Sequence, residues 1–509
     1  MTEKAPYAII EWNRLLVILM GGVMSSVAQI AHILREVLEE EANRLGRESG
    51  WQQRQRALSG ADFVQTLLFG WWQDPQISLD GLTQVAGRRL VQISASGLHQ
   101  RFTPEAAQLL FQILTQLVEA HFHHPLVETL PFLRAFPAVL LEDSSTIALP
   151  RELVQIWQGS GKEDGKVSAP ASVKLFVRLD LRNGTLEGPV LTAGRHTDTR
   201  SPLSLDDIPA GGLYLADLGF ASGQRFGQIV GKAAGLRGAD KRYFLSRLLP
   251  KMRLQTRRGH RIELRGILPQ QVGERIELGV ILPTAGRLPV RLILERVPEE
   301  VAEWRREHVR EAARHQGREA NEEVLNLCGW CLLLTNVPRR LLTIEQVLVL
   351  IRARWQIERL FCLWKDQGGV DRWHSQHPWR ILCELYAKLA AMVVQHWLVG
   401  LGCWQDPYRS MVKAAQVCRR EAGRVMASLV EGNLEAVLTA VVRCMQSGCR
   451  LNTRKQFPST AQYLAGTPLT GKQRPHLPKR PRRRRTRRWP AGRGWTSNRQ
   501  VRKVPLADP

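Results

Sequence analysis

The chain has 509 residues, enough for several domains with large cores. Its formal net charge is +25, from 72 Lys and Arg against 47 Asp and Glu, and this excess indicates a polyanionic partner. From Lys472 onward there are fourteen Lys or Arg and one Asp, so the tail carries +13 and the rest of the chain carries +12. The body of the protein is therefore basic in its own right.

Two features that suggest other protein classes are weak. The eight cysteines include one Cys-x2-Cys pair, Cys328 and Cys331, without the second pair that a zinc ribbon needs. The pair lies in an apolar run, so reduced thiols of a cytosolic protein are a simpler interpretation than a redox or metal site. The apolar run 15–31 lacks a signal cleavage site and leads into a charged helix at 32–45, which favours an internal helix over a membrane segment.

Residues 1–130 have helical patterns throughout, and we expect a helical N-terminal region here that binds DNA. Thr103-Pro104-Glu105 predicts a helix start, with a capping threonine, a proline at the first position and an acidic first turn. The segment 78–102 fits two short helices with a turn near 94–97. Such a helix-turn-helix would suit DNA, although two packed helices of any bundle give the same pattern.

Residues 131–250 are predicted to form the first part of an α/β core. Ala138–Glu142 has the pattern of a buried strand that ends at Asp143, and Leu213–Ala216 that of a strand that ends at Asp217. Between them, 173–191 alternates apolar and polar residues around an Asn-Gly turn, which predicts a hairpin. Side chains at strand ends converge on ligands in open sheets with helices on their faces. Both aspartates are candidate site residues, with an ordinary turn or cap residue as the alternative for each.

A β-rich subdomain is expected next, at 251–325, and its first part is strongly basic. Its predicted strands are 262–264, 275–281 and 290–294. A charged surface helix is expected from Pro298 to Glu323. An apolar strand through 328–334 then returns the chain to the core.

The stretch from Arg354 to Lys365 carries the most informative pattern. Glu358 lies one turn from Arg354 and two turns from Lys365, so a helix places all three on one face. An adjacent apolar face, with spacing i, i+3, i+4 and i+7, would pack on a core: Ile357, Leu360, Phe361 and Trp364. Thr343–Gln346 fits a capping box at the start of this helix. A carboxylate between two cations suits metal and phosphate, whereas ordinary i, i+4 salt bridges would use the same residues.

Three acidic residues, Asp143, Asp217 and Glu358, can together hold two divalent ions roughly 3.5–4 Å apart. One ion would activate a water or a sugar 3′-hydroxyl, and the other would stabilise the leaving oxygen. We therefore expect the three carboxylates to converge in the fold. The basic charge of the chain fits chemistry on a nucleic-acid backbone.

These motifs resemble those of insertion-sequence transposases of the DDE type, which have a ribonuclease-H-like core. Within this class the chain is similar to a group, the insertion-sequence-four family, that is marked by a Tyr-x2-Arg-x3-Glu-x6-Lys signature. Arg354, Glu358 and Lys365 match three positions of that signature at the right spacing. The segments Leu-Leu-Glu-Asp143-Ser-Ser-Thr and Leu-Ala-Asp217-Leu-Gly-Phe resemble the two aspartate motifs of the group.

The resemblance covers about residues 60–400 and implies an activity. The enzyme would cut double-stranded DNA at element ends and join the freed 3′-hydroxyl to target DNA. Asp143, Asp217 and Glu358 would be the catalytic residues and would hold two Mg²⁺ ions, for which Mn²⁺ can substitute. Joining two ends implies a dimer in the DNA complex.

The resemblance also implies roles for basic residues. Arg354 and Lys365 would bind phosphates near the cut, and Arg247 follows a strand that resembles the one after the second aspartate motif. The sequence departs from the signature at its tyrosine, which is replaced by Ile351, so a phosphate-binding hydroxyl is missing. Trp304 is a weak candidate for the tryptophan with which some relatives hold a flipped base.

The predicted fold class is α/β, with a ribonuclease-H-like mixed sheet core, a β-rich insertion subdomain and helical regions at both ends. The expected regions are 1–130 helical and DNA-binding, 131–250 core, 251–325 insertion, 326–375 core with the glutamate helix, 376–465 helical, and 466–509 a basic disordered tail. The tail would be a DNA-holding arm or an unselected extension. We expect a cytoplasmic, nucleoid-associated bacterial protein without a membrane role. The rival functions are a catalytically inactive DNA-binding protein of transposase descent and a two-metal nuclease without strand transfer.

Overall fold

The computed structural model describes residues 26–53, 58–124, 131–160, 170–231, 241–315, 317–404, 406 and 408–451. The basic tail and residues 15–25 of the apolar run lie outside these ranges, so the predictions for them are not examined by the structure. Contacts divide the chain into two compact units. The described residues of the smaller unit are those of Val297–Gly329, and the larger unit holds the rest.

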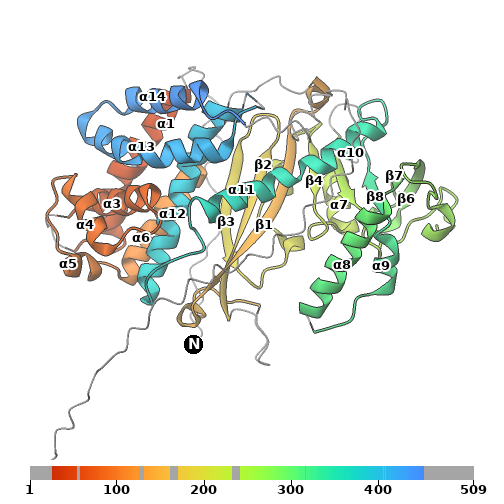
Figure 1. Cartoon of the computed structure of the whole chain (residues 1–509), viewed down its shortest axis with the longest axis horizontal. Coiled ribbons are helices and arrows are strands. Elements are labelled where there is room, and N and C mark those ends of the chain that lie inside the picture. The colour runs from red at the N-terminus through yellow and green to blue at the C-terminus, as the bar shows by residue number, and fades with distance from the viewer. Residues whose placement is uncertain are drawn as a thin grey trace, which may run out of the picture. The chain divides into compact units, whose positions relative to one another are not determined.

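The larger unit contains one eight-stranded mixed sheet among its described residues (Figure 1). The strands are β1 (Val139–Leu149), β2 (Ala171–Asp180), β3 (Leu186–Ala193), β4 (Leu213–Ala216), β5 (Tyr243–Arg247), β6 (Arg275–Leu282), β7 (Leu288–Arg296) and β8 (Trp330–Thr335). Their order is β3-β2-β1-β4-β5-β8-β7-β6. β1, β4 and β5 run parallel to one another, and the other neighbours are antiparallel. An antiparallel hairpin followed by parallel β1, β4 and β5 is the ribonuclease-H-like arrangement, which confirms the predicted fold class.

Several strand predictions hold, and two are wrong. The hairpin β2–β3 and the strand β4 have nearly the predicted bounds. β1 does not end at Asp143 but continues to Leu149, because β2 still pairs with it after β4 has ended. Residues 262–264 form no strand; they have no strand partner and are only half-buried, and Leu264–Ile267 is a short 3-10 helix. β6 and β7 extend the core sheet through β8.

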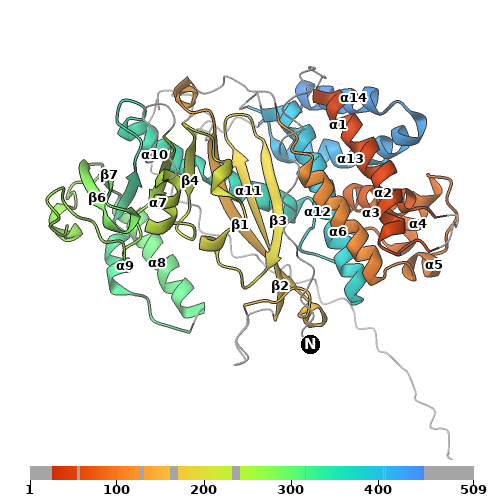
Figure 2. The same cartoon turned by 180° about the vertical axis from the view of Figure 1, so that it is seen from behind.

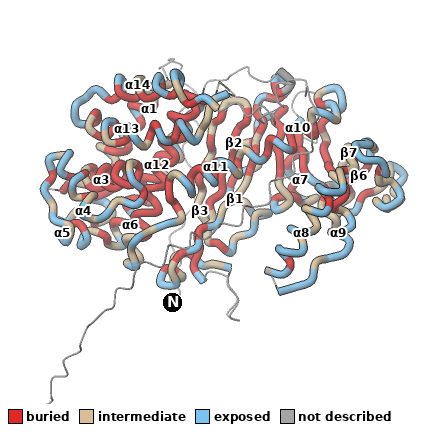
Figure 3. The backbone as a smooth tube through the Cα atoms, in the orientation of Figure 1, coloured by how far each residue is buried: buried red, intermediate tan, exposed pale blue. Residues whose placement is uncertain are grey.

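A helical layer lies beside the β3 side of the sheet (Figures 1 and 2). It consists of α1 (Ser26–Arg35), α2 (Ala42–Glu48), α3 (Gly60–Gln73), α4 (Leu79–Gly87), α5 (Ala95–His99), α6 (Pro104–Glu119), α12 (Pro378–Val399), α13 (Met411–Glu431) and α14 (Leu434–Ser447). α12 is its central helix and packs against α6, α3, α13 and α14. Every residue from Ile381 to Val399 is buried (Figure 3). By length and composition Pro378–Trp404 could cross a membrane, but its most apolar 18-residue window is wholly buried inside the protein.

The start of α6 is confirmed, and the predicted helix-turn-helix is corrected. Thr103 caps α6, with its side chain accepting a hydrogen bond from the Ala106 N–H. The turn between α4 and α5 lies at 88–93 and not at 94–97. The reason is Ser94, whose hydroxyl accepts from the Gly97 N–H and starts α5 where the turn was expected.

The smaller unit is helical where it is described. The predicted helix 298–323 is two helices, α8 (Glu299–His315) and α9 (Glu322–Leu327). Gly317 has a φ of +64°, a backbone conformation that a helix cannot continue through. In α8 the ring of Trp304 packs against His308, at a centroid distance of 3.9 Å. Cys328 and Cys331 do not form a disulfide with each other.

A buried histidine pair joins the helical layer to the β2–β3 turn. His124 Nε2 donates to the Trp397 carbonyl at 3.0 Å, and His396 Nε2 donates to the Gly184 carbonyl at 2.7 Å. Burial lowers the pKa of His124 to about 3, helped by the nearby His396, and burial lowers the pKa of His396 to about 4. Both rings are therefore neutral in the folded protein from about pH 5 upward.

This pair predicts a loss of stability in mild acid. Below the ordinary histidine pKa of about 6.5 the unfolded chain binds two protons that the folded chain does not, so stability is complete above that pH and falls as the pH drops. Between pH 7.5 and pH 5 the free energy of unfolding should fall by about 2 kcal/mol per histidine. Urea unfolding measured across this range checks it. A double variant, His124→Gln and His396→Gln, should show a flatter dependence, and an equally steep one would contradict this account.

Candidate active site

Parallel pairing places three candidate residues side by side. Glu142 of β1 pairs with Ala216 of β4, and Ala216 pairs with Ser246 of β5. The residues that come next in the chain are Asp143 on β1, Asp217 directly after β4, and Arg247 on β5, so the three lie at about one level across the sheet. Residues in register on parallel strands point to the same face. The Arg247 side chain is exposed.

The glutamate helix crosses the same face of the sheet. α11 (Trp355–Asp366) packs on β1 (Figure 1), and its predicted apolar face, including Ile357 and Trp364, is buried. Lys365 Nζ lies 3.5 Å from the carbonyl oxygen of Thr146, three residues beyond Asp143 on β1. α11 therefore contacts β1 as it crosses the sheet, with Glu358 near its start and Lys365 near its end.

The predicted cap belongs to a different helix. Thr343 and Gln346 form a capping box, but they start α10 (Ile344–Ala353), and α11 begins after a break at Arg354. Ile351, at the tyrosine position of the signature, is buried in α10. The break sets Arg354 at the junction of the two helices.

Arg354 contacts two of the three acidic side chains. Its Nε lies 3.6 Å from Asp217 Oδ1, and its Nη2 donates to Glu358 Oε1 at 2.7 Å. The side chain is only 8% exposed, and its Nε and Nη1 have no hydrogen-bond partner. The Arg354 guanidinium thus joins the end of β4 to the glutamate helix. Its Nε and Nη1 remain available to a further acceptor.

The charges of Arg354, Asp217 and Glu358 also act on the carboxyl group of Asp143. Burial, aided by the carboxylates of Asp217 and Glu358, raises its pKa to about 7 against the opposing effects of the Ser144 N–H and the Arg354 guanidinium. The Ser144 N–H donates to Asp143 Oδ1 at 2.8 Å. A partly buried carboxyl beside two more carboxylates is an environment that favours a bound cation.

The carboxylates of Asp143, Asp217 and Glu358 are chemically suited to a hard divalent ion. Carboxylate oxygens are the ligands that Mg²⁺ prefers. Among the residues that the structure describes, no three Asp, Glu, His or Cys side chains already stand in a metal-binding arrangement. Arg354 lies between Asp217 and Glu358 and supplies the positive charge there. Convergence of the carboxylates on an ion therefore requires Arg354 to move aside.

Sequence analysis missed a fourth carboxylate beside the site. Asp198, in the connection between β3 and β4, accepts hydrogen bonds from Ser144 Oγ at 2.8 Å and from Lys174 Nζ at 3.1 Å. It also lies against Gly219, where an added Cβ would come within 2.8 Å of Asp198 Oδ2. Asp198 thus braces the segments that follow both aspartates. Its sequence context, a polar loop, gives no signal of this contact.

Behind the site, Glu142 is completely buried between two arginines. Its Oε2 accepts from Arg178 Nη2 of β2 at 2.8 Å, and its Oε1 accepts from Arg225 Nη2 at 2.7 Å. Arg225 belongs to α7 (Gly223–Gly231) and also donates to the Tyr214 hydroxyl of β4. Because neighbours along a strand face opposite sides, this network lies on the face opposite to Asp143. It ties β1, β2, β4 and α7 together directly beneath the candidate site.

The chain is similar to known proteins over most of its length. Three similar curated proteins are transposases of insertion sequence elements. That of IS231F from Bacillus thuringiensis subsp. israelensis is 25% identical over 386 residues, covering 71% of this chain and 78% of the relative. That of IS231C from Bacillus thuringiensis subsp. berliner is 23% identical, covering 81% and 86%. That of IS1151 from Clostridium perfringens is 24% identical, covering 70% and 78%.

One solved structure and one family complete the comparison. A chain of the piggyBac transposase synaptic complex with hairpin DNA aligns with a TM-score of 0.40 and 11% identity, covering 85% of this chain and 88% of that one. Residues 134–394 match the family described as the transposase DDE domain. The match spans more than half of the 509 residues and contains Asp143, Asp217 and Glu358. The chain therefore belongs to the transposase DDE domain family.

Proposed function

We propose that this DNA transposase cuts at the ends of its element and joins the freed 3′-hydroxyl to target DNA, with Asp143, Asp217 and Glu358 as its catalytic carboxylates. The observation that carries the assignment is the set of contacts made by Arg354 at the sheet edge. It reaches Asp217 and Glu358 directly, and its charge also acts on Asp143. Two of the three carboxylates contact this cation and the third lies within its electrostatic reach, so together they would supply oxygen ligands for a divalent metal ion.

Members of this family use divalent metal ions, and we propose that two Mg²⁺ ions, or Mn²⁺, are held by the three carboxylates. When bound, they would supply an activated hydroxyl and charge stabilisation at the leaving oxygen. The protein contributes the placement. The β1–β4 register fixes the two aspartates, and packing of α11 on β1 fixes Glu358.

Basic residues around the acidic trio would hold the DNA backbone. Arg354 has two buried N–H groups without an acceptor, which suits a phosphate oxygen. Arg247 is exposed at the level of Asp217. Lys365 lies two helical turns after Glu358 on α11. Ile351 is buried and supplies no hydroxyl, so these cations would bind phosphate without the tyrosine of the signature.

A strand-transfer assay distinguishes this function from its two rivals. The purified chain is incubated with Mg²⁺, duplex DNA carrying the inverted repeat of the element, and a target plasmid. A transposase releases 3′-ends and joins them to the plasmid. Cleaved ends without joined product would identify a nuclease, and bound DNA without cleavage would identify an inactive descendant; either result would overturn the proposal.

Lys365→Ala should weaken binding to element-end DNA. Its ammonium has only a long contact to Thr146, so it remains available to phosphate. Loss of one phosphate contact should lower the slope of log affinity against log salt concentration by about one. Fluorescence anisotropy at several salt concentrations measures it. An unchanged slope together with a lower melting temperature would mean that Lys365 only braces α11 on β1.

Two wider assignments follow from the same activity. We propose that the working complex holds two copies of the chain, because two element ends must be joined. We also propose that the helical part within 1–130 binds DNA and that the protein acts on the bacterial chromosome in the cytoplasm. Crosslinking of the DNA complex, followed by measurement of its mass, tests the number of copies.

A further inference from the structure

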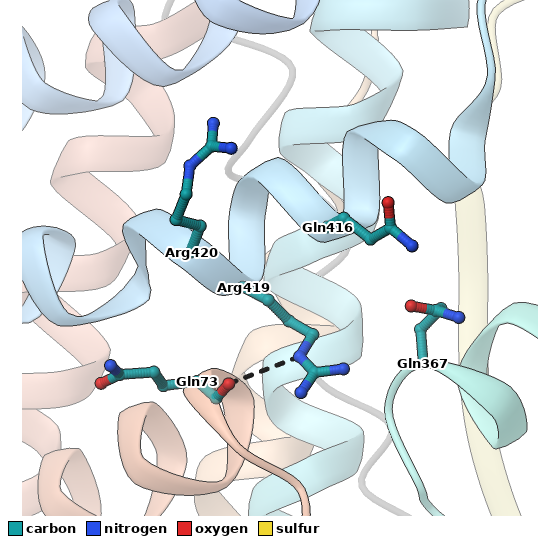
Figure 4. Close-up of a pocket in the computed structure, with 5 residues that line it drawn as sticks. All are labelled: Gln73, Gln367, Gln416, Arg419 and Arg420. Carbon is teal, nitrogen blue, oxygen red and sulfur yellow. Dashed lines mark hydrogen bonds between the residues drawn. The ribbon is translucent and has the colours of Figure 1, made fainter.

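A second candidate binding site lies beyond the end of the glutamate helix. It is an open pocket of about 390 Å³ where the C-terminal ends of α3 and α11 meet α13. The side chains that line it are Gln73, Gln367, Gln416, Arg419 and Arg420 (Figure 4). All five are amides or guanidiniums, so the lining carries positive charge and no carboxylate. This chemistry suits a phosphate backbone.

Arg419 is the arginine whose position in the pocket is fixed by a hydrogen bond. Arg419 Nε donates to the backbone oxygen of Gln73 at 3.4 Å, and its guanidinium extends between Gln73 and Gln367 (Figure 4). The Gln73 side chain accepts from Arg88 Nη1 at 3.3 Å, which brings a further cation to the rim. Arg420 points away from Gln367 (Figure 4).

The pocket continues into a basic stripe on α13. Gln416, Arg420 and Arg424 are exposed and four residues apart, so they lie on one face of the helix. Lys413 lies on the same side, one turn before Gln416. Glu421 is the acid within this stretch, and Arg420 Nε lies 3.3 Å from its carboxylate.

The end of α11 is fixed, so the spacing from active site to pocket is defined. Lys388 of α12 donates to the carbonyl oxygens of Gly369 and Arg372, directly after α11, and to buried Glu384 at 2.6 Å. Gln367 follows Glu358 by nine residues of helix, which is about 14 Å at 1.5 Å per residue. Phosphates of one strand are spaced about 3.4 Å apart along the duplex axis, so this length corresponds to about four base pairs.

We propose that this pocket and the α13 stripe bind the phosphate backbone of duplex DNA about four base pairs from the cleaved phosphate. The inference rests on the proposed function, since the cleaved phosphate is placed at the acidic trio. Lys365 lies between Glu358 and Gln367 along α11 and adds a further cation between the two sites, so that basic residues mark a path from one to the other. DNA is the occupant that matches this path, because it carries one phosphate at every base-pair step along the duplex axis.

The test uses two single variants of the full chain. Arg419→Gln removes the pocket cation, and Gln416→Glu adds a negative charge at an exposed position that should not disturb folding. The matched controls make the same changes elsewhere in the helical layer: Arg443→Gln and Gln446→Glu on α14, both exposed. Melting temperatures establish that all four variants are folded.

Affinity is measured on element-end duplexes of two lengths, which stop about two or about eight base pairs beyond the cleaved phosphate. One pair of duplexes is extended on one side of the cleaved phosphate and a second pair on the other side. On the long duplex of one side, both pocket variants should bind about threefold to tenfold more weakly than wild type, with a smaller salt slope for Arg419→Gln. On the short duplex they should match their controls. Equal loss on both lengths, or no loss on either, overturns the pocket assignment even if the wild type cuts and joins DNA. A wild-type protein that neither cuts nor joins overturns the proposed function as well.

Discussion

Asp143→Asn is expected to lower the rate of end cleavage by roughly a thousandfold or more. The carboxylate of Asp143 is partly buried beside Asp217 and Glu358, and an amide of the same shape cannot balance the charge of a divalent ion there. Loss of several kcal/mol of stabilisation in the transition state corresponds to this factor, since each 1.36 kcal/mol changes a rate about tenfold. Joining of 3′-ends should fall in parallel, because the same site performs both steps. Single-turnover assays on pre-bound DNA measure the two rates.

Two further measurements separate catalysis from folding. Affinity for element ends should stay close to that of wild type, and Mg²⁺ or Mn²⁺ should raise the melting temperature of wild type but not that of the variant. Asp198→Asn is the matched control, because Asp198 contacts Ser144 and Lys174 without belonging to the trio. A loss of cleavage as large in Asp198→Asn as in Asp143→Asn would show that the acidic trio has been wrongly chosen.

The local sequence pattern predicted those elements whose conformation depends on neighbouring residues in the sequence. The strand β4 and the turn of the β2–β3 hairpin were predicted because buried alternation and an Asn-Gly turn leave few other conformations. The helix around Glu358 was predicted for the same reason, since its apolar face has helical spacing. Asp217 follows the last residue of β4 as predicted, whereas Asp143 lies within β1, and the parallel register of the two strands brings the aspartates level.

The remaining features depend on contacts between distant parts of the chain. β1 continues past Asp143 because β2 covers it, which no local pattern of residues 143–149 shows. Arg354 was predicted as a neighbour of Glu358, but its contact with Asp217, 137 residues away in the sequence, required the fold. Asp198 was missed for the same reason.

Glu142→Gln is expected to cause the largest loss of stability of any single conservative change near the site. Glu142 has no exposed surface, and each of its carboxylate oxygens accepts a hydrogen bond from a buried arginine, Arg178 or Arg225. The amide keeps the shape but removes the charge that two buried guanidiniums share. Arg178 retains Glu187 at 2.8 Å, whereas Arg225 retains only the Tyr214 hydroxyl. Breaking a buried ion pair in this way typically costs about 3–5 kcal/mol.

Chemical denaturation followed by circular dichroism measures this loss, and the surface pair of Glu48 with Arg44 is the control. Those residues lie one helical turn apart on α2, and Arg44 Nη1 lies 2.5 Å from Glu48 Oε2. Both side chains are exposed. Glu48→Gln should therefore change the free energy of unfolding by no more than about 0.5 kcal/mol. If Glu142→Gln were as mild as the control, the network would not hold β1 against β4 and α7. The placement of Asp143 beside Asp217 would then depend on backbone pairing alone. A large loss would show that the charge buried behind the sheet maintains the register on which the acidic trio depends.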